Sequence, residues 1–333
     1  MALRPNTFLV GSMKSGTTYL SELLAMHTEV FMSSPREPCH FADPKVLRQV
    51  WPEMWRRGYW RGTGRYFGLF ANAGDAKIIA EGSPVYSQAP LFRHVPERIL
   101  EMCPDAKFIY IMRDPVERTI SHYWHRVQWW GERRRPVEAL LEDPHYLSTS
   151  DYAYQLRTYL RHVPRERVYV LTLEELVADP LTQLRALFGW LGVDPTFQPA
   201  LHGAFTNPTP ATVEQARGFG LLNRMRKSPV YARIGARVPA RMRKLARRLA
   251  VREVRTADVP RESVEAYLRP IQLRQTSELS ELLGRQFPQW TTLFAEPFAS
   301  PRITVGDVGN YGKAYRADLQ SGAQERRGRT ADG

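Results

Sequence analysis

Cysteine is almost missing from this chain, whose 333 residues include only Cys39 and Cys103. Two thiols in a chain of this length do not make a disulfide framework, and their spacing fits no zinc site. The sequence therefore excludes a small disulfide-stapled fold and favours a reducing, cytoplasmic setting.

Long apolar runs are also missing. No stretch of 18 consecutive apolar residues occurs, so no helix is expected to span a membrane. The first residues, MALRPNTFLVGSMKSG, lack the apolar segment and the small-residue cleavage site of a signal peptide. Hydrophobic residues make up 43% of the chain, which is ordinary for a soluble globular protein with one large α/β domain or two modest ones.

Acidic residues are scarce in one region. Residues 224–255 contain twelve Arg or Lys and one acid, Glu253, so they contribute +11 of the formal net charge of +13. Within this region, residues 238–251 are expected to form a helix with a basic face and a narrow apolar stripe. Three interpretations are open: a solvated face, steering of an anionic acceptor or cofactor, and peripheral contact with an anionic membrane surface. A nucleic-acid-binding protein, whose affinity would fall steeply with salt, is the alternative from another class.

Apolar segments of strand length alternate with amphipathic segments of helix length over residues 7–191. Such alternation predicts a parallel sheet with helices on both faces. The expected strands are residues 7–11, 29–32, 77–81, 107–113 and 167–173, and the expected helices are residues 17–26, 90–102, 115–130 and 181–191. No convincing strand follows Gly192. Residues 263–287 are expected to form another amphipathic helix, and the polar residues 317–333 are expected to be disordered.

One glycine-containing loop carries the clearest chemical signal. The first strand ends at Gly11, four residues follow, and Gly16, Thr17 and Thr18 open a helix. The backbone N–H groups of such a loop and the positive end of the helix dipole both attract an anion. An ATP-binding loop places its lysine directly after the second glycine, but this loop has Thr17 there and Lys14 inside the loop. A P-loop kinase, which would also need magnesium, therefore lacks its defining residue.

A lysine inside the loop suits the transfer of a sulfuryl group. This group carries less charge than a phosphoryl group, so the leaving phosphate depends less on Mg²⁺, and one ammonium near the bridging oxygen can stabilise it. Loss of such a donor typically costs about 2.7–4 kcal/mol of transition-state stabilisation. The position of Lys14 therefore favours sulfate transfer over ATP hydrolysis.

Four motifs in this order resemble the sulfotransferases that use 3′-phosphoadenosine 5′-phosphosulfate (PAPS). Residues 14–18 (KSGTT) resemble the family's 5′-phosphosulfate loop, and residues 113–123 (RDPVERTISHY) resemble its 3′-phosphate motif. Residues 35–42 (PREPCHFA) are similar to its Lys-Glu-Pro segment, and residues 81–86 (EGSPVY) to the Glu-x-Ser/Thr-Pro-x-Tyr segment of the Golgi and heparan branch. The resemblance implies a P-loop-like three-layer α/β sandwich with a central parallel sheet and a helical C-terminal part.

The resemblance also implies PAPS as the sulfate donor, no metal, and a hydroxyl or amine of a small molecule, carbohydrate or lipid as the acceptor. No nucleic-acid partner is expected. We expect one sulfotransferase domain over residues 1–294, with the cofactor-binding core at 5–195 and the helical part at 196–294. Residues 295–333 would form an extension. Arg217 is the nearest candidate for the late loop that closes over the adenosine in this family.

The motifs imply roles for single residues. Lys14 would stabilise the departing phosphate. The 5′-phosphate and the sulfate would be bound by Ser15, Gly16, Thr17 and Thr18. Arg113 and Ser121 would hold the 3′-phosphate, because an arginine can bind two phosphate oxygens at once. The alternative for Arg113 is an ordinary ion pair with Asp114 or Glu117.

Glu81 is the predicted general base that deprotonates the acceptor. It ends an apolar strand at the carboxyl edge of the sheet, where active sites of α/β folds form, and an acid is rarely buried without a role. Because a histidine does this work in the cytosolic branch of the family, three histidines are rival bases: His40, His122 and His125. The segment around His40 departs from the family pattern, since Arg36 replaces its lysine and Cys39 stands where its histidine is usual.

Overall fold

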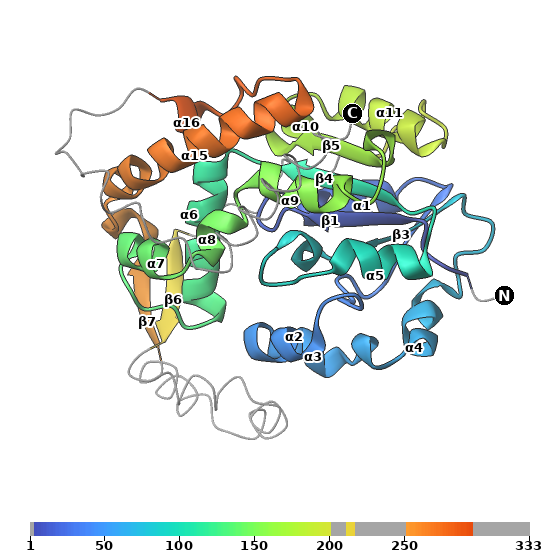
Figure 1. Cartoon of the computed structure of the whole chain (residues 1–333), viewed down its shortest axis with the longest axis horizontal. Helices are drawn as coiled ribbons and strands as arrows, with labels where there is room; N and C mark the ends of the chain where they lie inside the picture. The colour runs from blue at the N-terminus through green and yellow to red at the C-terminus, as the bar shows by residue number, and fades with distance from the viewer. Residues whose placement is uncertain (1–2, 201–210, 217–250, 296–333) are drawn as a thin grey trace, which may run out of the picture.

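The computed structural model describes residues 3–200, 211–216 and 251–295, and its centre is a five-stranded parallel sheet (Figure 1). The strand order is β2-β3-β1-β4-β5. The strands are β1 (Thr7–Gly11), β2 (Val30–Met32), β3 (Ile78–Gly82), β4 (Lys107–Met112) and β5 (Val168–Thr172). All five predicted strands are present, and the predicted α/β class with a central parallel sheet is confirmed.

Both faces of the sheet are buried, as the near-continuous apolar sequences of β1 and β4 require. Phe8 and Phe108 pack into one hydrophobic core, with their ring centroids 6.0 Å apart. Leu9 and Ile109, one position further along each strand, pack into the other core. Because side chains alternate across a strand, the two cores lie on opposite faces, which gives the predicted three-layer sandwich.

Two groups of helices cover these faces. One core is completed by α1 (Thr17–Ala25), α10 (Leu173–Ala178) and α11 (Pro180–Leu191), and the other by α5 (Val95–Met102), α6 (Pro115–Trp129) and α9 (Tyr152–Leu160). The helix predicted at residues 90–102 begins only at Val95. His94 has a left-handed φ of 58°, which an α-helix cannot include.

Shorter helices fill two connections for which no elements were predicted. Between β2 and β3 lie α2 (Pro44–Val50), α3 (Pro52–Arg57), α4 (Thr63–Phe67) and the 3₁₀ turns η1 (Tyr59–Arg61) and η2 (Gly68–Phe70). Between α6 and α9 lie α7 (Pro136–Glu142) and α8 (His145–Ser148). The remaining 3₁₀ turns are η3 (Pro84–Ser87), η4 (Arg165–Arg167) and η6 (Thr256–Asp258).

The structure corrects the prediction that no strand follows Gly192. β6 (Thr212–Ala216) and β7 (Val251–Arg255) form an antiparallel pair in which Val213 lies opposite Val254. Burial alternates along β6, where Val213 and Gln215 are buried and Thr212 is exposed, as it does in strands with one buried face. The C-terminal part is therefore not wholly helical. Arg217, residues 238–250 of the predicted basic helix and residues 296–333 lie outside the described residues.

The long helix α15 (Arg261–Leu283) and the short helix α16 (Thr291–Phe294) fix the start of α6. Gln272 of α15 donates to Pro115 O at 3.1 Å and to Thr119 Oγ1 at 2.8 Å. The N–H of Leu293 donates to Asp114 Oδ2 at 2.9 Å. No helix among the described residues is both long and apolar enough to cross a membrane.

Candidate functional site

The loop between β1 and α1 holds Lys14 in a left-handed turn. Lys14 has a φ of 70°, and Gly16, the N-cap of α1, has a φ of 87°. The left-handed conformation costs a residue with a side chain roughly 1–2 kcal/mol, so the loop holds Lys14 there against its own preference. Gly11 is needed for a close approach, because a Cβ at this position would lie 1.8 Å from Ser87 Oγ.

The start of α1 is open to an anion. Gly16 supplies no capping side chain, and the first turn contains no acid. Ser15 Oγ is buried and makes no hydrogen bond within the described residues, and the neighbouring Tyr152 hydroxyl donates to Arg113 O at 2.7 Å. Buried polar atoms normally find partners, so the loop has the hydrogen-bonding capacity that a bound phosphate or sulfate group would use.

Three cations gather beside this loop. Burial lowers the pKa of Lys14, and the nearby charges of Arg113 and Arg118 lower it further. Burial also lowers the pKa of Arg118 to about 10. Among the described residues, Lys14 makes no hydrogen bond or ion pair, and Arg118 has no carboxylate partner. A bound anion would stabilise all three charges at once.

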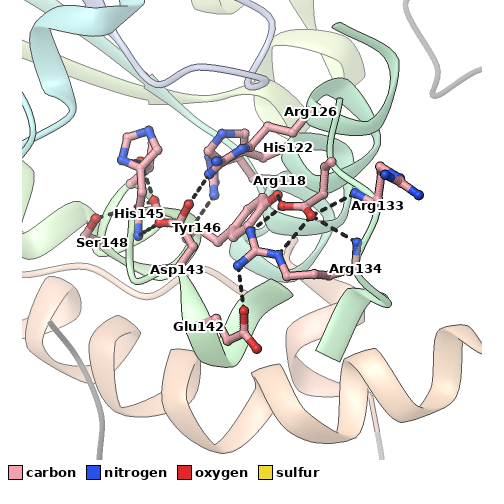
Figure 2. Close-up of polar contacts among 12 residues, drawn as sticks. Arg118, His122, Arg126, Arg133, Arg134, Glu142, Asp143, His145, Tyr146 and Ser148 are labelled. Carbon is pink, nitrogen blue, oxygen red and sulfur yellow. Dashed lines mark hydrogen bonds and ion pairs between the residues drawn. The ribbon is translucent and has the colours of Figure 1, made fainter. Parts of the chain in front are cut away.

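The polar contacts in Figure 2 fix Arg118 in this position. Its guanidinium donates to Tyr146 O at 2.6 Å and to Ser150 Oγ at 2.5 Å, and it lies 3.4 Å from His122 Nδ1. Two turns further along α6, Arg126 pairs with Asp143 at 2.5 Å. These contacts hold α6 to the α7–α8 segment, so the buried charge of Arg118 belongs to the rigid frame of the site.

Arg113 directly follows β4 and forms an ion pair with Glu117 in this structure. Its guanidinium lies 3.4 Å from Glu117 Oε2, while the other oxygen of Glu117 accepts hydrogen bonds from Arg261 and from the Thr292 hydroxyl. The ion-pair alternative for Arg113 is thus present in this structure. Arg113, Glu117 and Arg261 also line a cavity of about 450 Å³ between α6 and the C-terminal segment. Ser121, buried two turns further along α6, does not line this cavity.

Glu81 is enclosed completely. Its side chain has no exposed surface, Oε1 accepts hydrogen bonds from the Tyr66 and Tyr86 hydroxyls, and Oε2 accepts one from Ser83, all at 2.9 Å. Burial raises the pKa of Glu81 to about 7, although the three hydroxyl donors oppose the shift. Three of the roughly four acceptor sites of this carboxylate are therefore occupied by protein hydroxyls, and the side chain has no contact with solvent.

A different carboxyl group faces Lys14. Glu37 lies in the loop after β2 with a φ of 57°, is half-buried, and makes no side-chain hydrogen bond or ion pair within the described residues. Burial raises the pKa of Glu37, while the charges of Arg57 and Lys14 lower it. This residue belongs to the Lys-Glu-Pro-like segment at residues 35–42, but no role was predicted for it. The glutamate of that segment was the signal that could have identified it.

The three histidines differ in their surroundings. His40 Nδ1 lies 2.7 Å from Tyr59 O, and its ring stacks on Tyr66 at 4.1 Å. His122 is fully buried, and burial with the charge of Arg118 holds its pKa well below the usual value. Burial and the charge of Lys14 lower the pKa of His125 to about 3.

Comparison with known proteins decides the family. A sequence profile of the sulfotransferase family matches residues 5–199, more than half of the chain. The chain belongs to the sulfotransferase family. The predicted membership in the PAPS-dependent sulfotransferases is therefore confirmed.

Two relatives and one solved structure describe the likeness further. Mouse (Mus musculus) heparan sulfate glucosamine 3-O-sulfotransferase 3A1 is 30% identical over 198 residues, which are 57% of this chain and 46% of the relative. Membrane-associated sulfotransferase kil1 of Dictyostelium discoideum is 29% identical over 132 residues, 40% of this chain and 25% of the relative. The chain thus spans about half or less of the curated relatives' length. A sulfotransferase crystal structure from Alicyclobacillus acidocaldarius has the same fold, with a TM-score of 0.63, 22% identity, and coverage of 86% of this chain and 99% of that one.

Proposed function

We propose that this member of the sulfotransferase family moves the sulfuryl group of PAPS to a hydroxyl or amine of an acceptor. PAPS would supply a sulfuryl group activated by its bond to a phosphate. One observation carries the proposal: an unpaired lysine inside a glycine-bounded loop, beside two arginines and an orphaned serine hydroxyl. This arrangement attracts an anion and places an ammonium next to it.

The positions of the loop residues, and of Arg113 and Ser121, support a specific role for each in binding PAPS. Lys14 would donate to the oxygen that becomes negatively charged as the bond to sulfur breaks. Ser15, Gly16, Thr17 and Thr18 would bind the 5′-phosphate end through hydroxyls and the N–H groups at the start of α1. Arg113 and Ser121 would bind the 3′-phosphate, for which Arg113 has to exchange Glu117 for a phosphate oxygen.

For the general base we propose Glu37 in place of the predicted Glu81. A base needs a free lone pair within reach of the acceptor. Glu37 accepts no side-chain hydrogen bond within the described residues and feels the charge of Lys14, whereas the fully buried Glu81 already accepts three hydroxyl hydrogen bonds. The raised pKa of Glu37 makes it a stronger base than an exposed carboxylate, and the Lys14 charge favours its ionised form. Glu81 would then position Tyr66, Tyr86 and Ser83 beneath the site.

A carbohydrate is the acceptor class that the relatives favour. Several of them are named as heparan sulfate glucosamine 3-O-sulfotransferases, and their similarity to this chain supports a glycan hydroxyl as the group sulfated here.

The test of this proposal compares two conservative variants, Glu37→Gln and Glu81→Gln. Acceptors are screened with labelled PAPS, and binding of the desulfated product, 3′-phosphoadenosine 5′-phosphate (PAP), is measured by calorimetry without magnesium. We expect Glu37→Gln to keep its PAP affinity and to lose about 10²–10⁴-fold in turnover, the usual contribution of a general base. Near-normal turnover in Glu37→Gln, with loss in Glu81→Gln, would return the role to Glu81. Failure of the wild type to bind PAP would overturn the proposed function itself.

A further inference from the structure

The segment between β2 and β3 is rich in arginine and tryptophan. Residues 44–70 contain six basic residues and one acid, Glu53: the basic residues are Lys45, Arg48, Arg56, Arg57, Arg61 and Arg65. This net charge of +5 lies in α2, α3, η1 and α4, outside the basic region at 224–255. In Figure 1 these helices form a layer along one side of the sheet.

Arginines and aromatic rings alternate on this layer. The Arg48 guanidinium lies 5.0 Å from the centre of the Trp55 ring, and Trp55 stacks on Trp60 with centroids 5.5 Å apart at 23°. Arg61 lies 5.9 Å from the Trp55 ring and 5.4 Å from the Trp60 ring. On the next turn, Arg65 lies 5.3 Å from the Tyr59 ring. We name Arg48, Trp55, Trp60, Arg61 and Arg65 the Arg–Trp ladder.

The three arginines of the ladder are exposed, and none makes a hydrogen bond or ion pair within the described residues. Their neighbours are engaged differently: Arg57 pairs with Glu53 at 3.6 Å, and Arg56 donates to Pro52 O at 3.1 Å. A guanidinium that lies over an aromatic ring keeps its N–H edge free for an anion, and the ring holds the side chain in place. The ladder therefore has unused capacity for anions.

The ladder is joined to the reaction site. Arg57, two residues after Trp55, donates to Arg36 O at 2.9 Å, and its charge acts on Glu37, which also faces Lys14. His40, three residues after Glu37, contacts Tyr59 O at 2.7 Å. An acceptor whose hydroxyl lies at Glu37 would extend from the loop toward this layer.

We propose that the Arg–Trp ladder is an acceptor subsite that binds an anionic group, a carboxylate or a sulfate, carried on a sugar or aromatic ring. The guanidinium edges of Arg48 and Arg61 bind the anion, and the indole faces of Trp55 and Trp60 pack against the ring. The inference rests on the proposed function, and it adds that the acceptor is acidic before it is sulfated. It also assigns the recognition of that acid to residues 48–65.

The experiment measures binding by calorimetry at fixed ionic strength. The probes are a heparan sulfate hexasaccharide, a neutral form of it that is desulfated, N-acetylated and carboxyl-reduced, and 4-hydroxyphenylacetate as a small ring acid. The test variant is Arg48→Gln/Arg61→Gln. The control is Arg161→Gln/Arg185→Gln, which removes the same number of exposed arginines from the end of α9 and from α11. PAP binding is measured with every variant to show that the cofactor site is intact.

We expect the wild type to bind an acidic probe and to bind the neutral hexasaccharide much more weakly. Affinity for the acidic probe should fall about tenfold or more in the ladder variant, since two charge-assisted contacts are lost, and should change little in the control. Tighter binding of the acidic hexasaccharide would indicate a glycan acceptor, and tighter binding of 4-hydroxyphenylacetate would indicate a small aromatic acid. Equal binding of the neutral form, or equal losses in both double variants, would overturn the subsite. If PAP still binds in either case, the proposed function survives without it.

Discussion

At the scale of single residues, the enclosed carboxyl of Glu81 makes stability depend on pH. In the folded protein the pKa of Glu81 is raised to about 7, whereas an unfolded glutamate loses its proton near the ordinary pKa of 4.5. The folded state therefore binds more protons between these two values, and the free energy of unfolding falls as the pH rises through this window, by about 3 kcal/mol in total.

The check is chemical denaturation of wild type and Glu81→Gln at several values between pH 4.5 and pH 7.5. Because glutamine does not ionise, the stability of the variant relative to wild type should increase as the pH rises. The difference between the two proteins isolates Glu81 from other titrating groups. Parallel pH curves would show that Glu81 does not carry this proton.

A second residue prediction concerns Gly11. An alanine Cβ there would lie 1.8 Å from Ser87 Oγ and 3.0 Å from Ser87 Cβ, so Gly11→Ala should destabilise the fold by about 1–3 kcal/mol. Ser87→Gly removes both atoms and should recover part of this loss in the double variant. A double-mutant cycle measured by denaturation gives the coupling. Additive effects would mean that the loop relaxes by another route.

At the scale of elements, Asp114 links two helices. Its Oδ1 accepts the N–H groups of Val116 and Glu117 at the start of α6, and its Oδ2 accepts the N–H of Leu293 from α16. Asp114→Ala should lose the cap, worth about 1 kcal/mol, and leave a buried N–H without a partner, at about 1–3 kcal/mol more.

The matched control is Asp43→Ala, because Asp43 caps α2 through Lys45 and Val46 but accepts no other hydrogen bond within the part of the chain that the structure describes. Denaturant titration should show a clearly larger loss for Asp114→Ala. Equal losses in the two variants would mean that the Leu293 contact adds nothing to stability.

The elements also show what the sequence could and could not predict. β1 and β4 were predictable because strands buried on both faces have near-continuous apolar sequences, and Asp114-Pro115 marked the start of α6. β6 and β7 were not predicted from the sequence because each is short, partly charged, and paired with a strand more than thirty residues away. Local patterns carry no information on such pairing.

The candidate site also contains residues whose roles were predictable from the sequence and residues whose roles were not. Lys14 and Arg113 were predictable because their motifs fix both the residue type and its place at the end of a strand. The roles of Glu37 and Glu81 depend on which carboxyl group accepts hydrogen bonds from the protein. Glu81 does, because the hydroxyls of Tyr66, Tyr86 and Ser83 surround it. These partners come from three places in the chain, and only the folded structure brings them together.

At the scale of the whole molecule, three parts meet around one loop. The sheet supplies Lys14 and Arg113 at its carboxyl edge, the α2–α4 layer reaches Glu37 through Arg57, and the C-terminal helices hold the start of α6. Arg261 of α15 shares Glu117 with Arg113, so the C-terminal part reaches the residue proposed to bind the 3′-phosphate.

This arrangement predicts that the C-terminal helices contribute to donor binding. Arg261→Gln removes one of the partners of Glu117 and leaves that carboxylate freer to hold Arg113. PAP affinity measured by calorimetry should therefore decrease by a small factor, while heparan-type probes of the Arg–Trp ladder are unaffected. Unchanged PAP affinity in Arg261→Gln would show that the C-terminal helices do not contribute to donor binding.

The central claim is tested most directly by PAP binding to wild type and Lys14→Met in the presence of a metal chelator, with thermal unfolding of both proteins. Wild type should bind PAP without metal, and Lys14→Met should bind at least about tenfold more weakly, because a charge-assisted contact to phosphate is lost. Its stability should be equal or higher, since burial and two arginines already disfavour the Lys14 charge in the free protein. Undiminished affinity in Lys14→Met would contradict the account.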